Sequence, residues 1–307
     1  MSTLSYQVVD VFTDVAFAGN PLAVVLDADG LATTALQALA REFHLSETAF
    51  PLLPDAAGAD YRLRIFTPET ELPFAGHPSI GAAWVLARLG RISPGVVRQS
   101  CGAGVLPLSV EAGPGRVELT GGTPTVGEPV DPAPWLAAVG LVAADLAGPP
   151  SRVAGAGLDF GYLSVSEAAL ARAAPDLGRL RGLGAAGLSV FAWHGGRARA
   201  RVFAGDVGVP EDPATGSAAL GLGAYLVATG LVPGDTTTSY VVHQGLELGR
   251  PSTLECTVRA VGGAAVQCRV AGRVVAIARG EIVRPSSTGV TPSYGGESPD
   301  PAPDQRG

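Results

Sequence analysis

Hydrophobic and polar positions in the first 122 residues predict several short strands and two helices. Residues 35–43 place Leu36, Leu39 and Phe43 on one stripe at helical spacing. Residues 78–89 predict a second helix of small side chains, closed by Gly90 as a C-terminal cap. Short apolar or alternating segments predict strands at 6–12, 22–26, 49–53 and 61–66, and two or three more between 96 and 119.

The second half of the chain repeats this mixture of strands and helices. The pattern predicts one helix at 133–147 and another at 217–228, the latter closed by Gly230. Strands are expected at 162–165, 188–193 and 198–203, followed by short strands between 241 and 283. The Gly-Gly-Thr-Pro segment 121–124 is the best candidate for a linker. Residues 285–307 contain many Pro, Ser, Gly and Asp, and predict a disordered tail.

The two halves resemble each other at a nearly constant spacing. Arg64-Ile65-Phe66 matches Arg201-Val202-Phe203, and a shift of 140 residues places Gly76, Gly81, Leu86 and Gly90 on Gly216, Gly221, Leu226 and Gly230. Each half has a strand, a polar loop and a Gly/Ala-rich helix that a sheet can approach closely. We therefore predict a duplication, with lobes at 1–122 and 123–273, and we expect a strand at 274–284 to return to the first lobe.

The composition narrows the possible chemistry. The net charge is −7 and all 21 Lys-or-Arg residues are Arg, which excludes a Schiff-base lysine, a pyridoxal-phosphate anchor and a P-loop lysine. An acidic chain without basic clusters argues against nucleic acid as a partner. Apolar runs fall short of the ~18 residues of a membrane helix. Since residues 1–10 also lack the pattern of a secretory signal, we expect a cytoplasmic protein without a membrane partner.

Several formal motifs do not fit their usual context. Residues 182–187 match GxGxxG but precede a strand, whereas a dinucleotide site needs the glycines after a strand and before a helix. Ser217 lacks the second glycine of a GxSxG nucleophile elbow. The four histidines form no ligand pair, and Cys101, Cys256 and Cys268 are too widely spaced for a metal or disulfide pattern. We expect neither a metal nor a cofactor.

Two loops stand out because each opens a small-residue helix. They are residues 67–78, with His77 near the helix start, and residues 211–217, with Asp212 and Ser217. Free N–H groups at a helix start favour an anion, so two facing starts would make a carboxylate-binding cleft. The alternative is that Asp212, Thr215 and Ser217 only cap helices and that His77 is a satisfied polar residue.

Ser46-Glu47-Thr48 is a polar triplet between apolar neighbours and follows the first helix. An enclosed Glu47 would have a raised pKa, which suits a group that transfers protons near neutrality. An ordinary turn is the alternative.

At these residues the chain resembles a known family. The motifs occur in the order Asp10-Val11-Phe12-Thr13, Gly19-Asn20-Pro21, Ser46-Glu47-Thr48, Phe66-Thr67-Pro68, Glu71 to Pro78, Glu211 to Ala219, Gln244-Gly245 and Gly249 to Ser252. Together they resemble the PhzF family, the phenazine-biosynthesis isomerases related in fold to diaminopimelate epimerase, over about residues 6–284. The resemblance implies an α+β fold of two lobes, each a β-barrel wrapped around a central helix, with the active site between them.

The resemblance also implies roles for individual residues. Glu47 is expected to be the acid/base of a cofactor-free isomerisation, with His77 and Asp212 assisting protonation. Ser46, Gly76, Thr215, Gly216 and Ser217 are expected to bind a small carboxylate substrate. A two-thiol racemase is excluded because none of the three cysteines lies in either loop. His44 departs from the family, which more often has asparagine there, and we expect it to adjust the pocket or the charge of Glu47.

The sequence therefore predicts a cofactor-independent isomerase that moves a proton on a small cyclic or unsaturated amino-acid-like carboxylate. The resemblance and the lysine-free composition favour bacterial secondary metabolism, of phenazine or another antibiotic. A homodimer is expected from the family alone. Two alternatives stay open: a hydrolase or lyase in which Glu47 activates water or a leaving group, and a non-catalytic small-molecule binder.

Overall fold

The computed structural model describes residues 2–113, 115–205 and 209–285. The tail predicted to be disordered lies, from residue 286 onward, outside the described residues. The first half contains β1 (Thr3–Val11), β2 (Asn20–Val25), α1 (Thr33–Phe43), β3 (Glu47–Leu52), β4 (Tyr61–Phe66), β5 (Glu71–Leu72), α2 (Gly76–Arg88), β6 (Gly95–Cys101), β7 (Gly104–Val110) and β8 (Val117–Thr120).

The second half contains a longer set of elements. They are β9 (Thr125–Pro129), α3 (Ala133–Ala138), the 3₁₀ turn η1 (Ala143–Asp145), β10 (Arg152–Gly155), β11 (Asp159–Ser164), α4 (Glu167–Arg172), α5 (Leu177–Leu180), β12 (Leu188–His194), β13 (Arg197–Ala204), β14 (Val209–Asp212), α6 (Gly216–Ala228), β15 (Thr237–Gln244), β16 (Ser252–Val261), β17 (Ala264–Gly272) and β18 (Val274–Val283).

The strands form two lobes with the same pairing scheme. In the N-terminal lobe the order is β18-β1-β2-β3-β4-β6-β7-β8, with β2–β3 and β4–β6 parallel and the other pairs antiparallel. In the C-terminal lobe the order is β9-β10-β11-β12-β13-β15-β16-β17, with β11–β12 and β13–β15 parallel. The parallel pairs thus fall at the same two places, which agrees with a duplication.

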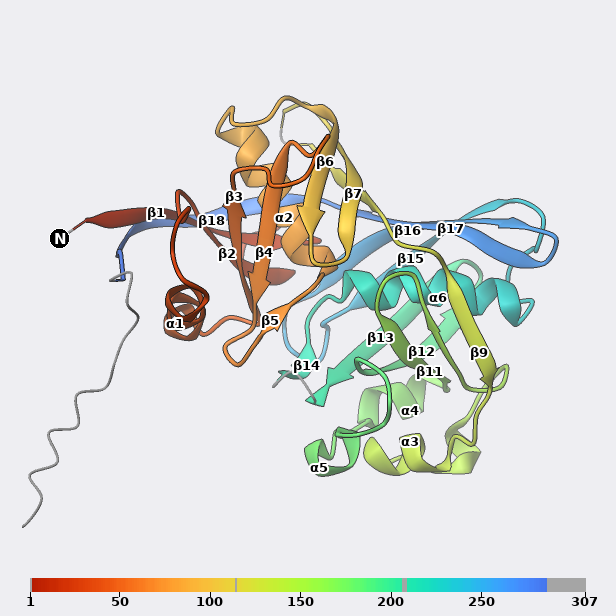
Figure 1. The fold of residues 1–307 in the computed structure, drawn as a ribbon. Helices are drawn as coiled ribbons and strands as arrows, with labels where there is room; N and C mark the ends of the chain where they lie inside the picture. The colour runs from red at the N-terminus through yellow and green to blue at the C-terminus, as the bar shows by residue number, and fades with distance from the viewer. Residues whose placement is uncertain (1, 114, 206–208, 286–307) are drawn as a thin grey trace, which may run out of the picture.

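The lobes are joined by strands as well as by the chain (Figure 1). β8 pairs antiparallel with β17, and β18 leaves the C-terminal lobe to pair with β1 along its whole length. The final strand therefore does return to the first lobe. The division of the chain at residues 122 and 273 stays a prediction.

One helix lies inside each lobe and is buried on nearly all sides. α2 packs on β1, β2, β3, β7 and β8, and α6 packs on β9, β10, β11, β16 and β17. Small side chains permit this enclosure: a Cβ at Gly81 would lie 2.5 Å from the Leu22 side chain, and one at Gly221 would lie 2.4 Å from the Tyr162 hydroxyl. Gly90 and Gly230 end the two helices with φ of 68° and 72°, as predicted.

Two predicted elements differ from the structure. The helix predicted at 133–147 ends at Ala138, because Gly140 adopts φ of 67° and breaks the helical path before η1 begins. The segment 241–283 contains strands of 9 and 10 residues, β16 to β18, rather than short ones. β17 has partners in both lobes, β16 and β8, while β16 pairs with β15 and β17 and β18 pairs with β1 along its whole length.

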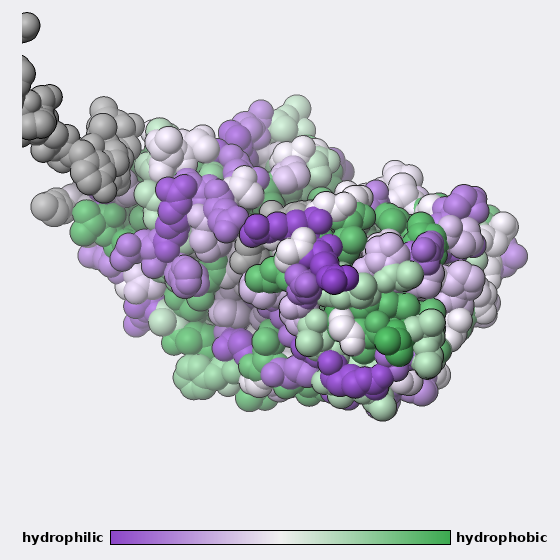
Figure 2. All heavy atoms as spheres, turned by 90° about the horizontal axis from the view of Figure 1, so that it is seen from below, coloured by the Kyte–Doolittle hydropathy of each residue, from purple (hydrophilic) through white to green (hydrophobic). Residues whose placement is uncertain are grey.

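The outer surface has no single character in the view from below. Hydrophobic and hydrophilic residues are interspersed over this face (Figure 2). Among the described residues, no helix has both the length and the apolar character needed to cross a membrane.

Candidate active site

The two central helices begin against each other. A Cβ at Gly76 would lie 3.0 Å from the Gly216 Cα, so the backbones of the two helix starts are nearly in contact. Neither N-cap residue, Ala75 or Thr215, accepts a side-chain hydrogen bond from its own helix. The positive ends of two helix dipoles therefore meet in one buried place, which favours an anion there.

A pocket of about 150 Å³ opens between the lobes beside these helix starts. Its polar lining residues are Glu47, Asp212, Thr215 and Ser217. The rest of the lining is apolar and comprises Leu72, Pro73, Ala75, Leu158, Phe160, Ala186 and Ala204. Four of the predicted site residues thus line one small cavity, and the other residues that line it are apolar.

The other predicted residues lie next to the pocket. The His77 Nε2 atom is 3.5 Å from the Glu47 Oε2 atom, and Gly76 and Gly216 form the contact between the helices. The Ser46 hydroxyl donates a hydrogen bond to the Asn20 Oδ1 at 3.1 Å, and its expected contact with a substrate stays a prediction.

Asn20 is a site residue that the sequence reasoning missed. Its buried side-chain amide donates to the Asp212 Oδ1 at 2.8 Å and to the Ala214 carbonyl at 2.9 Å, and lies 3.2 Å from the His77 Nδ1. It is the only asparagine of the chain, and it lies in a recognised motif. That signal could have identified it. Asn20 connects the histidine of one lobe with the aspartate of the other.

The same contacts determine the protonation of His77. Burial lowers the pKa of His77 to about 3, so the imidazole is neutral near pH 7. The Asn20 Nδ2, which donates to Asp212 and Ala214, offers no acceptor to the nearby His77 Nδ1, so the tautomer that fits this contact carries the ring proton on Nε2. This N–H faces Glu47, and both the Nε2 and the Glu47 Oε2 are buried without a hydrogen-bond partner.

Both carboxyl groups of the site hold their protons more tightly than usual. Burial, followed by the negative charge of Asp212, raises the pKa of Glu47 well above its ordinary value. Burial also raises the pKa of Asp212 to about 6, against the opposing hydrogen bonds from Thr215 and Asn20. The site therefore contains two buried carboxyl groups whose pKa values are both raised, a direction that favours general acid/base chemistry near neutral pH.

The Asp212 loop is fixed by Gln244, a second residue whose role was not predicted. The Gln244 side chain donates to the Asp212 carbonyl at 2.7 Å and to the Thr215 hydroxyl at 3.0 Å, and it accepts from the Thr215 N–H at 3.2 Å. The Thr215 hydroxyl in turn donates to the Asp212 Oδ2 at 2.6 Å. Thr215 thus orients the catalytic candidate as well as lining the pocket.

His44 lies outside the pocket, so the expectation that it adjusts the pocket is wrong. It is an exposed residue with φ of 52° that ends α1. Asparagine and histidine are both enriched in this left-handed conformation, which accounts for either residue at this position.

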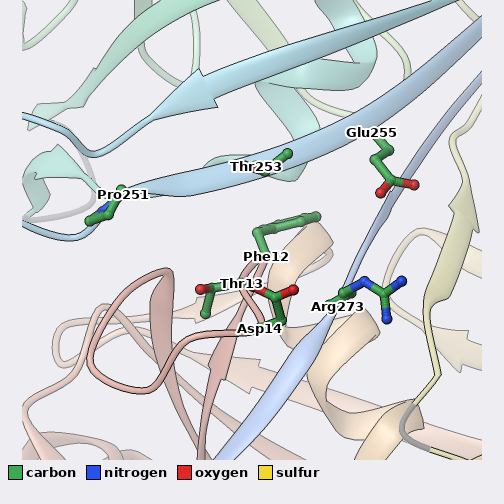
Figure 3. A pocket seen from close by; sticks show the side chains of 7 residues that line it. All are labelled: Phe12, Thr13, Asp14, Pro251, Thr253, Glu255 and Arg273. Carbon is green, nitrogen blue, oxygen red and sulfur yellow. The ribbon is translucent and has the colours of Figure 1, made fainter.

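A second pocket, of about 170 Å³, lies beside the Phe12 ring (Figure 3). Its lining comprises Phe12, Thr13, Asp14, Pro251, Thr253, Glu255 and Arg273. The Glu255 carboxylate is already paired with Arg116 at 2.6 Å. No predicted site residue lines this pocket.

Potential metal ligands and the three cysteines are present in the described parts of the chain. No group of three or more His, Cys, Asp or Glu side chains in residues 2–113, 115–205 and 209–285 could hold a metal ion. The three cysteines are free, and none lines the pocket with Glu47. Burial also raises the pKa of each thiol, which disfavours the reactive thiolate.

Comparison with known proteins agrees with this architecture. The phenazine biosynthesis-like protein family, PhzC-PhzF, matches residues 9–280. A trans-2,3-dihydro-3-hydroxyanthranilate isomerase of Pseudomonas aeruginosa is 35% identical and covers 90% of this chain and 98% of its own. An uncharacterised isomerase of Mesorhizobium japonicum is also 35% identical, over 92% of this chain and 99% of its own.

A solved structure gives the same result for the fold. The crystal structure of a PhzF-family phenazine biosynthesis protein from Bacillus anthracis superimposes with a TM-score of 0.82 at 25% identity, covering 92% of this chain and 100% of that one. The α+β fold with two lobes is confirmed. The chain belongs to the PhzC-PhzF family of phenazine biosynthesis-like proteins, and it is an isomerase of that family.

Proposed function

We propose that the protein is a cofactor-independent isomerase in which Glu47 moves a proton between two carbons of a small carboxylate. One observation supports this most directly: the Glu47 Oε2 and the His77 Nε2 are buried, lack hydrogen-bond partners and lie 3.5 Å apart beside the pocket. Unpaired buried polar atoms cost free energy, so their presence at a pocket indicates that a bound molecule completes them.

The reaction that we propose has two proton transfers and no net change of atoms. Glu47 as carboxylate removes a proton from an acidic carbon, and the electron pair of the broken C–H bond delocalises over the unsaturated substrate. Glu47, now a carboxylic acid, returns the proton to a different carbon. The Nε2–H of the neutral His77 faces Glu47 and can donate a hydrogen bond there. Asp212 assists the protonation of the substrate.

The substrate carboxylate would be held by backbone N–H groups rather than by a cation. No arginine is among the described residues that line the pocket, whereas the helix starts at Gly76 and Gly216 present uncapped N–H groups beside it. The Ser217 side chain lines the same region and can add a hydrogen bond. Preorganised donors of this kind also stabilise the delocalised anion formed between the two proton transfers.

The wall formed by Leu158, Phe160 and Ala186 favours a compact ring with one apolar edge. The similar proteins from Pseudomonas are named for action on trans-2,3-dihydro-3-hydroxyanthranilate, a cyclic amino acid of this kind. We propose this compound or a close analogue as the substrate, in a phenazine-type or other bacterial secondary pathway. A homodimer in the cytoplasm stays a prediction, which light scattering and cell fractionation can test.

Turnover in deuterated buffer tests the proposal. The protein is incubated with trans-2,3-dihydro-3-hydroxyanthranilate in D₂O, and the product is analysed by mass spectrometry and proton NMR. We expect an isomer of unchanged composition, with the label or the original hydrogen at a new carbon. A product that has gained or lost the elements of water would instead identify a hydrolase or lyase. Binding without any product would identify a non-catalytic binder.

A further inference from the structure

The repeated Arg-x-Phe motif has the same contacts in both lobes. On β4, Arg64 donates from Nε and Nη2 to the two carboxylate oxygens of Glu71, at 2.7 and 2.6 Å. On β13, Arg201 donates from the same two atoms to Glu211, at 2.8 and 2.6 Å. Each guanidinium also lies 5.1 Å from the ring of the phenylalanine two residues later. The duplication has therefore preserved a two-pronged ion pair.

Each glutamate of these pairs stands five residues before the first glycine of a central helix. Glu71 precedes Gly76, and Glu211 precedes Gly216. The strands that hold the glutamates are short: β5 has two residues and β14 has four. Such strands have few ladder hydrogen bonds, so a bidentate pair supplies much of what holds them in place.

The pair in the C-terminal lobe is the more deeply buried one. The Arg201 and Glu211 side chains are 7% and 9% exposed, against 13% and 36% for Arg64 and Glu71. Arg201 Nη1 also donates to the carbonyls of Leu170 and Ala173, at 3.2 and 2.6 Å. Four of the five N–H groups of Arg201 thus donate to Glu211 or to these two carbonyls, which fixes the orientation of the guanidinium.

The residue after Glu211 is Asp212, which lines the active-site pocket. Its backbone lies opposite Val202, the residue after Arg201. A displacement of Glu211 would therefore move Asp212 and the start of α6, where Gly216 has no spare space against Gly76. Errors of about 1 Å in such positions can cost about 100-fold in rate.

We propose that Arg201 is a positioning residue of the isomerase: by holding Glu211 it fixes Asp212 and the first turn of α6 against α2. Arg64 holds the corresponding loop of the N-terminal lobe, in which Leu72 takes the place of Asp212. The proposal rests on the isomerase function proposed above and adds to it a role for an ion pair that does not touch the pocket.

The charge of Arg201 has a second consequence for Asp212. The carboxylate of Glu211 raises the pKa of Asp212, and Arg201 compensates that negative charge. The other groups around Asp212 are Asn20 of β2, Glu47 of β3, Thr215 of its own loop and Gln244 of β15. A second carboxylate, Glu247, lies 4.0 Å from Arg201. Glu247 stays paired with Arg199, but Glu211 would lose its partner. Loss of the Arg201 charge should therefore raise the pKa of Asp212 further, because the Glu211 carboxylate beside it would be uncompensated.

Two substitutions separate geometry from charge. Arg201→Lys keeps the charge but loses the fork, whereas Arg201→Met loses both. We expect Arg201→Lys to lower kcat by about 10- to 100-fold, with a much smaller change in KM and an unchanged pH optimum. We expect Arg201→Met to shift the pH profile of kcat to higher pH as well. Arg91→Lys is the matched control, since Arg91 makes an equally bidentate but exposed pair with Asp27 far from the site in the fold.

A titration without substrate keeps this test independent of the proposed reaction. Carboxyl ¹³C NMR of aspartate-labelled protein, with Asp212→Asn for assignment, should show Asp212 titrating at higher pH in Arg201→Met and at lower pH in Glu211→Gln. If Arg201→Met does not fold, Glu211→Gln alone decides the charge effect. Wild-type kcat in Arg201→Lys, or an unmoved Asp212 titration, would overturn the proposal. Absence of turnover by the wild type would overturn the proposed function instead.

Discussion

The two lobes have the same strand order, yet they contribute differently to the site. Thr48 pairs with Phe66 and Leu188 pairs with Phe203, so the residues before them, Glu47 and Gly187, are equivalent. The N-terminal lobe has a carboxyl group at this position and the C-terminal lobe has only a hydrogen atom. At the helix starts the N-terminal lobe has His77 and the C-terminal lobe has Ser217.

The same asymmetry holds at one further position and is reversed at another. Ala23 pairs with Thr48 as Gly161 pairs with Leu188, which makes Asn20 and Leu158 equivalent. In the remaining pair the polarity is reversed, because Leu72 lies opposite Ile65 where Asp212 lies opposite Val202. The N-terminal half of the site therefore supplies Glu47, His77 and Asn20, whereas the C-terminal half supplies most of the apolar lining together with Asp212, Thr215 and Ser217.

This difference separates what a duplication preserves from what it leaves free. Both lobes retain the uncapped helix start, since backbone N–H groups are present whatever the side chains are. An anion can thus be held symmetrically by the two helices. The titratable side chains need not be symmetrical, and only the N-terminal lobe has a glutamate at this pair of equivalent positions. The following substitutions test this division, from the largest expected effect to the smallest.

Replacement of Glu47, the catalytic candidate of the N-terminal half, should have the largest effect. We expect Glu47→Gln to lower kcat by a factor of about 10² to 10⁴, the usual contribution of a general acid/base, with nearly intact substrate binding. The unfolding free energy above neutral pH should equal or exceed that of the wild type. The reason is that the raised pKa of Glu47 favours the folded state at low pH and opposes it as the pH rises through the folded-state pKa.

Steady-state kinetics and urea unfolding measure the two effects of Glu47→Gln. Glu42→Gln is the matched control, since Glu42 is exposed on α1. Normal turnover by Glu47→Gln would remove Glu47 from the mechanism and with it the functional difference between the lobes.

Exchange of the equivalent residues Asn20 and Leu158 should give unequal results. Asn20→Leu removes the amide that serves His77 Nδ1 and Asp212 Oδ1, so we expect a loss of activity and a stability cost of about 1–3 kcal/mol for the unpaired groups. Leu158→Asn alters only the apolar wall, and it should raise KM more than it lowers kcat. Kinetics and thermal melting compare the two variants. Equal effects of the two substitutions would contradict the unequal contributions of the N-terminal and C-terminal halves.

The pH dependence of stability should reveal Asp212, the carboxyl group that the C-terminal half contributes to the pocket lining. The pKa of Asp212 rises from 3.8 to about 6 on folding, so its stabilising effect is present below pH 3.8 and is lost as the pH rises to about 6. In Asp212→Asn the unfolding free energy should lack this decline. Urea titrations at several pH values, with the exposed Asp14→Asn as control, measure the difference. Parallel curves for wild type and Asp212→Asn would show that Asp212 has an ordinary pKa.

His44→Asn should have the smallest effect. The residue is exposed at the end of α1, and its left-handed backbone suits asparagine as well as histidine. We expect unchanged kcat and KM and a change in unfolding free energy of less than about 0.5 kcal/mol. A large change in either kinetic constant would show that the N-terminal half of the site extends to residue 44.

Local sequence patterns predict where many helices and strands begin, but they do not predict how far each one extends. The helices that begin at Gly76 and Gly216 were predicted within one or two residues, because small residues, polar entry loops and closing glycines are local signals. The helix at 133–147 was predicted too long, since apolar spacing continues past Gly140 while the backbone does not. The lengths of β17 and β18 depend on partners that are distant in the chain, β8 and β1, which no local window contains.

The site was predicted in its residue types and only partly in its contacts. Glu47, Asp212, Thr215 and Ser217 line one pocket, and their motifs indicated them. Asn20 was overlooked because its partners are 57 to 194 residues away in the chain. Ser46 is expected to bind substrate, which stays a prediction, and its hydroxyl donates to Asn20, a contact that exists only after folding.

The sequence by itself determined the inventory of chemistry: a duplicated framework, helix starts built from glycine, and carboxyl, imidazole and hydroxyl groups in place of lysine or paired thiols. The tertiary structure decided how these groups behave. It brought the two helix starts into contact, removed water from Glu47, His77 and Asp212, and thereby changed their protonation. The physical reason is that desolvation and hydrogen bonding depend on distances in space, whereas a sequence specifies only which groups are available.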